Sequence, residues 1–144
     1  TEAGKNRLAI LDFVNVEGRD GGSEGLLGKL ITEELTSVFF ETKKFTVVER
    51  HRLLSVLKEQ ELQVSGGVDE STAILLGKML GVQAVMLGTI GDFGDMFRVN
   101  ARLLDVETGE ALAIARTYIE KDERLLHFLD QRQFNLEARS KGGW

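Results

Sequence analysis

The feature that most constrains the fold is a nearly continuous apolar run from Arg7 to Val14. A strand in the middle of a sheet is buried on both faces and reads as an unbroken apolar run, whereas a half-exposed strand alternates. The run therefore predicts a central strand with both faces covered. At 144 residues the chain suits one domain. We expect residues 1–144 to form it, with a core of about 7–120.

Further elements follow from apolar periodicity and from turn and cap residues. We expect strands at 45–48, 82–90, 97–106 and 110–120, and helices from 23, from 49 or 50 to 62, from 69 or 71 to 80, and from about 122 to 138. On the first helix the predicted buried stripe is Leu27, Ile31, Leu35 and Val38. The order β-α-β-α-α-β-β-β-α predicts an α/β two-layer domain, a mixed sheet of about five strands with helices mainly on one face.

The last two strands alternate clearly between apolar and polar residues. If Val106 faces Glu110, the small residues Ala113, Ala115 and Thr117 join the apolar face of the sheet. Small side chains on that face would let helices pack closely against it.

Composition excludes several classes of function. The net charge of −5 argues against non-specific nucleic-acid binding, which needs clustered Lys and Arg. The absence of cysteine excludes disulfides, thiolate metal sites and cysteine nucleophiles. The stretch Gly22–Lys29 follows a strand, but it lacks the first glycine and the final hydroxyl of a phosphate-binding loop. We predict no catalytic residue, no metal site and no cofactor, because no nucleophile–base pair or metal cluster is present.

The polar face of the strand at 97–106 and its neighbour forms the first candidate partner-binding site. In the predicted register Arg98 lies opposite Tyr118 and Asn100 lies opposite Arg116. Arginine and tyrosine are typical of protein interfaces. A solvated face balanced by Glu110, Glu120 or the last helix would have the same composition. The candidate residues are Arg98, Asn100, Arg102, Arg116 and Tyr118.

The hairpin tip that precedes this strand is the second candidate. Phe93 and Met96 lie in or beside the turn Gly91–Asp95, while Phe97 is expected to point into the core. Exposed apolar residues at a tip can mark an interface. Capping of the core explains these residues equally well.

Several segments in order resemble a bacterial cell-envelope family that includes CsgG-like, FlgO-like and LpoB-like proteins and the amino-terminal part of TolB. They are Leu8–Phe13, Phe45–Arg50, Lys58–Gln60, Val64–Gly66, Leu76–Gly81, Val82–Gly88 and Val99–Glu110, and they span roughly residues 7–120. Structural roles account for the motif residues, since glycines serve helix caps, turns and close packing. These residues are Glu49, Arg50, Gly77, Gly81, Gly88 and Gly109.

The resemblance implies a non-catalytic, periplasm-facing protein-interaction domain in envelope assembly or secretion. Its expected partners are other envelope proteins, with a homo-oligomer as a further option and no nucleic acid. Any membrane attachment would come from an outer-membrane lipid anchor upstream. Pore-forming members of the family carry a membrane-spanning hairpin between the two corresponding strands. At that place in this chain only a few residues separate Ile90 from Phe97. Two alternatives stay open: a ring subunit that lacks its own membrane hairpins, and a small-ligand-binding domain.

Overall fold

The structure is a computed structural model, and it describes residues 6–15, 22–59 and 69–128. Residues 123–128 begin the predicted last helix, and its remainder lies outside the described residues, as do residues 60–62 of the second predicted helix. The predicted order is confirmed, with the first predicted strand divided in two. The elements are β1 (Arg7–Ile10), β2 (Val14–Asn15), α1 (Gly22–Thr42), β3 (Thr46–Val47), α2 (Arg50–Glu59), α3 (Glu70–Leu80), β4 (Ala84–Asp92), β5 (Met96–Asp105) and β6 (Ala111–Glu120).

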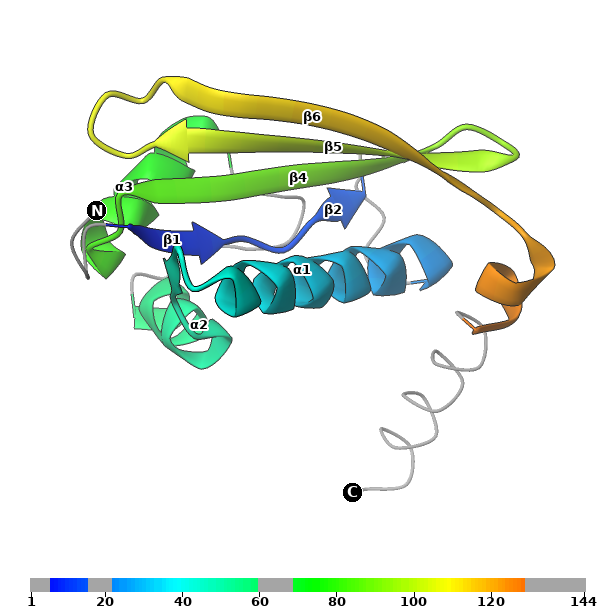
Figure 1. Cartoon of the computed structure of the whole chain (residues 1–144), viewed down its shortest axis with the longest axis horizontal. Coiled ribbons are helices and arrows are strands. Elements are labelled where there is room, and N and C mark those ends of the chain that lie inside the picture. The colour runs from blue at the N-terminus through cyan, green and yellow to red at the C-terminus, as the bar shows by residue number, and fades with distance from the viewer. Residues whose placement is uncertain (1–5, 16–21, 60–68, 129–144) are drawn as a thin grey trace.

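The strands form one mixed sheet of six strands in the order β3-β1-β4-β5-β6, with β2 also paired to β4. β1 runs parallel to β3 and β4, whereas β4, β5 and β6 pair antiparallel through two hairpins. Figure 1 shows β6 at the outer edge of the sheet, far from α1. The predicted mixed α/β sheet is therefore confirmed.

Helices cover both faces of the β1–β4 half of the sheet. Leu8 and Ile10 of β1 pack in a cluster with α1, while Ala9 and Leu11 pack in a cluster with α2 and α3. Successive residues of a strand point to opposite faces, so α1 lies on one face and α2 with α3 on the other. The double burial predicted for residues 7–14 is thus observed, and the helices are divided between the faces more evenly than expected.

The first strand breaks because Phe13 turns toward the α1 face. The Leu11 N–H still donates to the Met86 carbonyl at 3.0 Å, and pairing with β4 then stops until Val14. Phe13 is buried, and its ring occupies the space where a side chain on Gly88 would lie. Its N–H donates to Thr32 Oγ1 at 3.0 Å, and that hydroxyl donates to the Gly28 carbonyl at 2.8 Å. One residue therefore links the sheet to α1.

The stripe that α1 buries differs from the prediction at one position. Leu27 is buried and Ile31 and Leu35 are partly buried, as predicted, but Val38 is 45% exposed. Phe39 continues the stripe instead, and its ring meets the edge of Phe45 with centroids 5.4 Å apart. The prediction was wrong because the i+4 row from Leu35 leads to residue 39 on this long helix.

Motif residues at α2 and α3 have the structural positions expected of them. Glu49 directly precedes α2, and its carboxylate lies 3.1 Å from His51 Nδ1; the side chain of Arg50 lies outside the described residues. Gly81 ends α3 with a φ of 71°. A Cβ on Gly77 would lie 2.6 Å from Val106 Cγ2, which confirms close packing of α3 on the sheet. Gly109 turns the last hairpin with a φ of 77°.

β6 departs most from expectation. Ala113, Ala115 and Thr117 are all exposed, although they were expected to lie under closely packed helices. Along the whole strand Ile119 is the residue that is partly buried. The reason is geometric: β6 lies at the far end of the sheet order from β1, beyond the width that the described helices cover.

Gly88→Ala tests the packing of Phe13. A Cβ at position 88 would lie 2.1 Å from the Phe13 ring, so the ring must move, and overpacking of this kind costs about 1–3 kcal/mol. Denaturant unfolding should show that loss. Combining it with Phe13→Leu should give a double variant more stable than the sum of the single effects predicts, because the smaller side chain frees the space. Additive effects would show that the two residues do not compete for space.

Asp69→Ala tests the cap of α3. The Asp69 carboxylate accepts hydrogen bonds from the Thr72 N–H at 2.8 Å and the Ser71 hydroxyl at 3.0 Å. These bonds hold the pKa of Asp69 below its ordinary value of 3.8, and the bond from the Thr72 backbone N–H has the largest effect. A carboxylate whose pKa is lower in the folded state than in the unfolded state stabilises the fold at pH values above its unfolded-state pKa. This stabilisation is lost as the pH falls through the folded-state pKa.

Thermal unfolding at neutral pH should therefore show a lower Tm for Asp69→Ala than for the wild type, and the gap should close below about pH 4. Asp69→Asn is the matched control, because asparagine caps a helix nearly as well. It should keep most of the stability at neutral pH. An equal loss for both substitutions would mean that the cap depends on the charge alone.

Candidate partner-binding surface

The predicted polar face of β5 and β6 exists in the predicted register. Arg98 pairs with Tyr118 and Asn100 with Arg116, and Arg102 lies opposite Ile114. The same side of β5 continues into Leu104, which is fully buried in the cluster with α3. The even-numbered residues of β5 therefore extend from the part of the sheet that α3 covers to a part that the described helices leave exposed. We call the surface formed by Arg98, Asn100, Arg102, Arg116 and Tyr118 the basic face.

The arginines of the basic face differ in their partners. Arg102 forms an ion pair with Glu70 at the start of α3, and Arg116 Nε donates to Asn100 Oδ1 at 3.0 Å. The Arg98 guanidinium lies 4.2 Å above the Phe93 ring, and its Nε has no hydrogen-bond partner among the described residues. Within those residues the carboxylate that pairs with an arginine of this face is Glu70, and neither Glu110 nor Glu120 does so. Most of the last helix, which the solvated alternative also named, lies outside the described residues. Among the described residues, two of the three arginines therefore have no paired carboxylate.

The hairpin tip contributes to the same region. Phe93 is 49% exposed, Met96 is partly exposed, and Phe97 is buried, as predicted. The turn is tight, with the Phe93 N–H donating to the Met96 carbonyl at 2.9 Å and Gly94 at a φ of 84°. Because Arg98 stacks on Phe93, the exposed aromatic ring is joined to the basic face.

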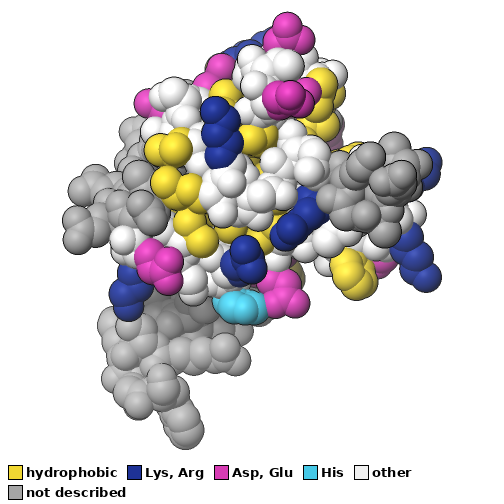
Figure 2. Space-filling view, turned by 90° about the vertical axis from the view of Figure 1, so that its left-hand side faces the viewer, with side chains coloured by type: hydrophobic (Ala, Val, Ile, Leu, Met, Phe, Trp, Pro, Cys, Tyr) yellow, Lys and Arg dark blue, Asp and Glu magenta, His cyan; other side chains and the backbone are white. Residues whose placement is uncertain are grey.

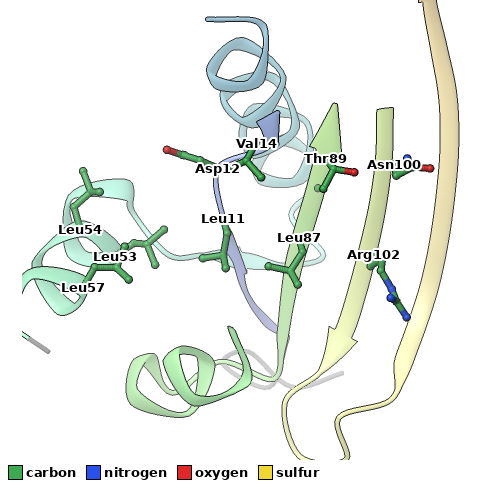
Figure 3. A pocket seen from close by; sticks show the side chains of 11 residues that line it. Leu11, Asp12, Val14, Leu53, Leu54, Leu57, Leu87, Thr89, Asn100 and Arg102 are labelled. Carbon is green, nitrogen blue, oxygen red and sulfur yellow. The ribbon is translucent and has the colours of Figure 1, made fainter. Parts of the chain in front are cut away.

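An apolar pocket opens beside the basic face. It has a volume of about 170 Å³ and lies between α2, the segment that joins β1 to β2, and strands β2, β4 and β5. Figure 3 shows the leucines of α2 on one side, Leu11 and Leu87 in the middle, and Thr89, Asn100 and Arg102 on the other side. Asn100 and Arg102 thus belong both to the pocket and to the basic face. The pocket is lined by Leu11, Asp12, Val14, Leu53, Leu54, Leu57, Leu87, Gly88, Thr89, Asn100 and Arg102.

The size of this pocket limits what it can hold. Ligand pockets commonly measure about 300–1,000 Å³, whereas an apolar cavity of about 150 Å³ accepts a group of the size of benzene. At about 170 Å³ the pocket fits one large apolar side chain. The apolar spacing on α2 predicts that Leu53, Leu54 and Leu57 all point inward, and this spacing gives no sign of a pocket. Leu53 and Leu57 are buried, but Leu54 is 43% exposed at the rim.

Two other kinds of site, a metal centre and a membrane-spanning helix, are lacking in the described part of the chain. No group of three or more His, Asp or Glu side chains there is arranged to hold a metal ion. None of the described helices is both long enough and apolar enough to cross a membrane. Figure 2 shows the side of the molecule with α3 and the β5–β6 turn, where apolar, basic and acidic side chains are interspersed. On this side the described residues do not form the clustered Lys and Arg patch that binds a phosphate backbone.

Comparison with known proteins identifies relatives by sequence and by fold. The model of the family described as curli production assembly/transport component CsgG matches residues 2–98, more than half of the chain. A search of curated proteins found no match.

Solved structures share the fold at low sequence identity. The C-terminal domain of LpoB from Salmonella enterica is 21% identical, with a TM-score of 0.63 over 81% of this chain and 84% of that one. The same domain from Escherichia coli is 18% identical, with a TM-score of 0.64 and the same coverage. A lipoprotein from Neisseria meningitidis is 17% identical, with a TM-score of 0.61 over 93% of this chain and 97% of that one.

Leu87→Phe tests whether the pocket is empty space. Leu87 lines the pocket, so the larger ring can enter it, and the free energy of unfolding should change by less than about 1 kcal/mol. Leu104→Phe is the matched control, because Leu104 is fully buried and extra carbons there should cost about 1–3 kcal/mol. Urea unfolding of both variants gives the comparison. Equal losses would show that the pocket does not accept an additional side-chain volume.

Proposed function

Because the chain belongs to the CsgG family of curli production assembly and transport components, we propose that it is a non-catalytic protein-interaction domain of the bacterial envelope. Its role would lie in envelope assembly or secretion, on the periplasmic side and in association with the outer membrane. The observation that carries the proposal is the basic face beside an apolar pocket, on a domain with this family relationship.

The basic face has the chemistry of a protein-binding surface. Arginine, tyrosine and an exposed phenylalanine are enriched where proteins contact each other, and the strongest contacts insert a side chain into a desolvated pocket. Here Arg98 and Arg116 have no carboxylate partner within the described residues, and a pocket for one apolar side chain lies alongside. A partner that presents acidic residues around one apolar side chain would complement this surface.

Two other functions are less well supported. A small-ligand-binding domain would need a larger pocket than one of about 170 Å³. A pore-forming subunit would carry a membrane-spanning hairpin between the strands that are β4 and β5 here, but these are joined by the tight turn at Gly94. A ring subunit without such hairpins is still compatible with the fold. Attachment to the outer membrane through a lipid anchor also belongs to the proposal, and the Neisseria protein of similar fold is described as a lipoprotein.

Cross-linking in intact cells tests the proposal. The native full-length protein would be compared with an Arg98→Glu/Arg116→Glu variant and with a Lys29→Glu/Lys44→Glu control. Lys29 and Lys44 are exposed and lie away from the basic face, and the control changes the net charge equally. All three proteins must show the same circular dichroism.

The wild type and the control should yield the same cross-linked envelope proteins by mass spectrometry, and the Arg98/Arg116 variant should lose them about tenfold or more, because charge reversal repels an acidic partner. Unchanged adducts in that variant would exclude the basic face as the binding surface. Adducts made only with cytoplasmic proteins would exclude the envelope role.

A further inference from the structure

Among the described residues β6 is an exposed edge strand. It closes the sheet order, and among the described residues β5 is the strand it pairs with. It is 10 residues long and almost entirely exposed on both faces. Ile114 is 68% and Tyr118 53% exposed. Proteins usually protect such edges with proline, lysine, bulges or a covering element, because a free edge pairs with other strands.

The backbone shows which groups along this edge are free. The Lys121 N–H donates to the Asp95 carbonyl at 3.0 Å, and the register between β5 and β6 is regular from Met96↔Glu120 to Leu103↔Ala113. Residues of an antiparallel strand alternate between pointing their N–H and C=O toward one neighbour and toward the other. The odd-numbered residues of β6 therefore bond to β5. The even-numbered residues from 114 to 120 direct their N–H and C=O outward.

A second copy of the same strand is the partner that the charges favour. Two copies of β6 can pair antiparallel about a two-fold axis, and the residue on the axis fixes every opposing pair. Within Ala111–Glu120, an axis at Ala115 places Arg116 against Ile114 and Tyr118 against Leu112, and an axis at Arg116 places two arginines together. Like charges directly opposite each other are destabilising.

An axis at Tyr118 instead places Arg116 opposite Glu120 of the other copy. By symmetry the pair occurs twice, and the two Tyr118 side chains meet between them. Axes at Ile114 or Thr117 put both charges against uncharged residues. Opposite-charge and aromatic cross-strand pairs are the favourable ones. We therefore propose that two copies of this chain dimerise by antiparallel pairing of β6 with Tyr118 on the two-fold axis.

This dimer is independent of the proposed function. The dimer forms through the edge of β6 and needs no other envelope protein, so it can exist even if no such protein binds. Because a two-fold interface is closed, the proposal gives two copies and not a growing filament. It would also join two basic faces into one continuous surface, since opposing residues of an antiparallel pair point to the same face.

Cysteine cross-linking tests the axis directly, because the chain contains no cysteine. A hydrogen-bonded antiparallel pair has Cα atoms about 5.5 Å apart, within the range of a disulfide. Tyr118→Cys should therefore give a covalent dimer on mild oxidation. Ile114→Cys is the matched control, because its two copies would be about 27 Å apart along the strands and should not cross-link. Dimers through position 114 and not 118 would overturn the proposed register.

Charge exchange tests the same pairing without a covalent bond. Arg116→Glu and Glu120→Arg should each weaken dimerisation by about tenfold or more in sedimentation equilibrium, because both opposing pairs become like-charged. The double variant Arg116→Glu/Glu120→Arg restores opposite charges and should recover the wild-type dimer. A wild-type protein that stays monomeric up to its solubility limit would overturn the proposal, as would a double variant no better than the single ones.

Discussion

The packing of Phe13 is the interaction on which the rest of the structure depends. Its ring fills the space above Gly88 in β4, and its N–H is held by Thr32 of α1, whose hydroxyl also bonds to the Gly28 carbonyl. A Cβ on Gly28 would itself lie 2.3 Å from the Phe13 carbonyl oxygen, so helix and strand are in direct contact there. The same turn of the chain breaks the first strand and leaves Leu11 on the opposite face, among the leucines that line the pocket. One residue thus fixes α1 on its face of the sheet and shapes the pocket on the other.

The sheet is consequently divided into a covered half and an open half. β1 and β4 carry helices on both faces, and burying each large apolar side chain there contributes about 1.5–3 kcal/mol. β6 extends past the described helices, so that its stability relies on β5, whereas β5 still buries Phe97, Val99 and Leu104 in the clusters with the helices. The features proposed to bind partners lie in the open half or at its border: the basic face, the aromatic tip, the pocket and the exposed edge of β6. A rigid covered half can hold these features in fixed positions for a partner.

Local sequence patterns predicted those features of the fold that depend on interactions between neighbouring residues. The apolar run at residues 7–14, the glycines Gly81 and Gly109 at positive φ and the β5–β6 register depend on neighbouring residues, and the structure confirms them. Of the two predicted starts of the third helix, Asp69 and Ser71, the structure has Asp69 as the cap. Coverage by other elements was harder to predict. Ala113 and Ala115 are exposed because the described helices do not extend over β6, and Val38 is exposed because the buried row of α1 continues through Phe39. Leu54 borders a pocket because residues distant in sequence leave space beside it. Periodicity shows which face of an element is apolar, but not how far its neighbour extends. The basic face was found because its residues alternate along one strand, and its binding role is still a prediction.

Residue-resolved amide hydrogen exchange at low protein concentration tests the central claim, that a doubly covered β1–β4 half holds the fold while the β5–β6 side is free for partners. Amides of β1 and β4 should exchange slowest, near the rate set by global unfolding, because both faces are buried. Those of β6 should exchange much faster, because the strand is exposed and bonded on one side among the described residues. Protection of β6 equal to that of β1 would contradict the account, since it would mean that the open half is as firmly held as the core and is not a free surface.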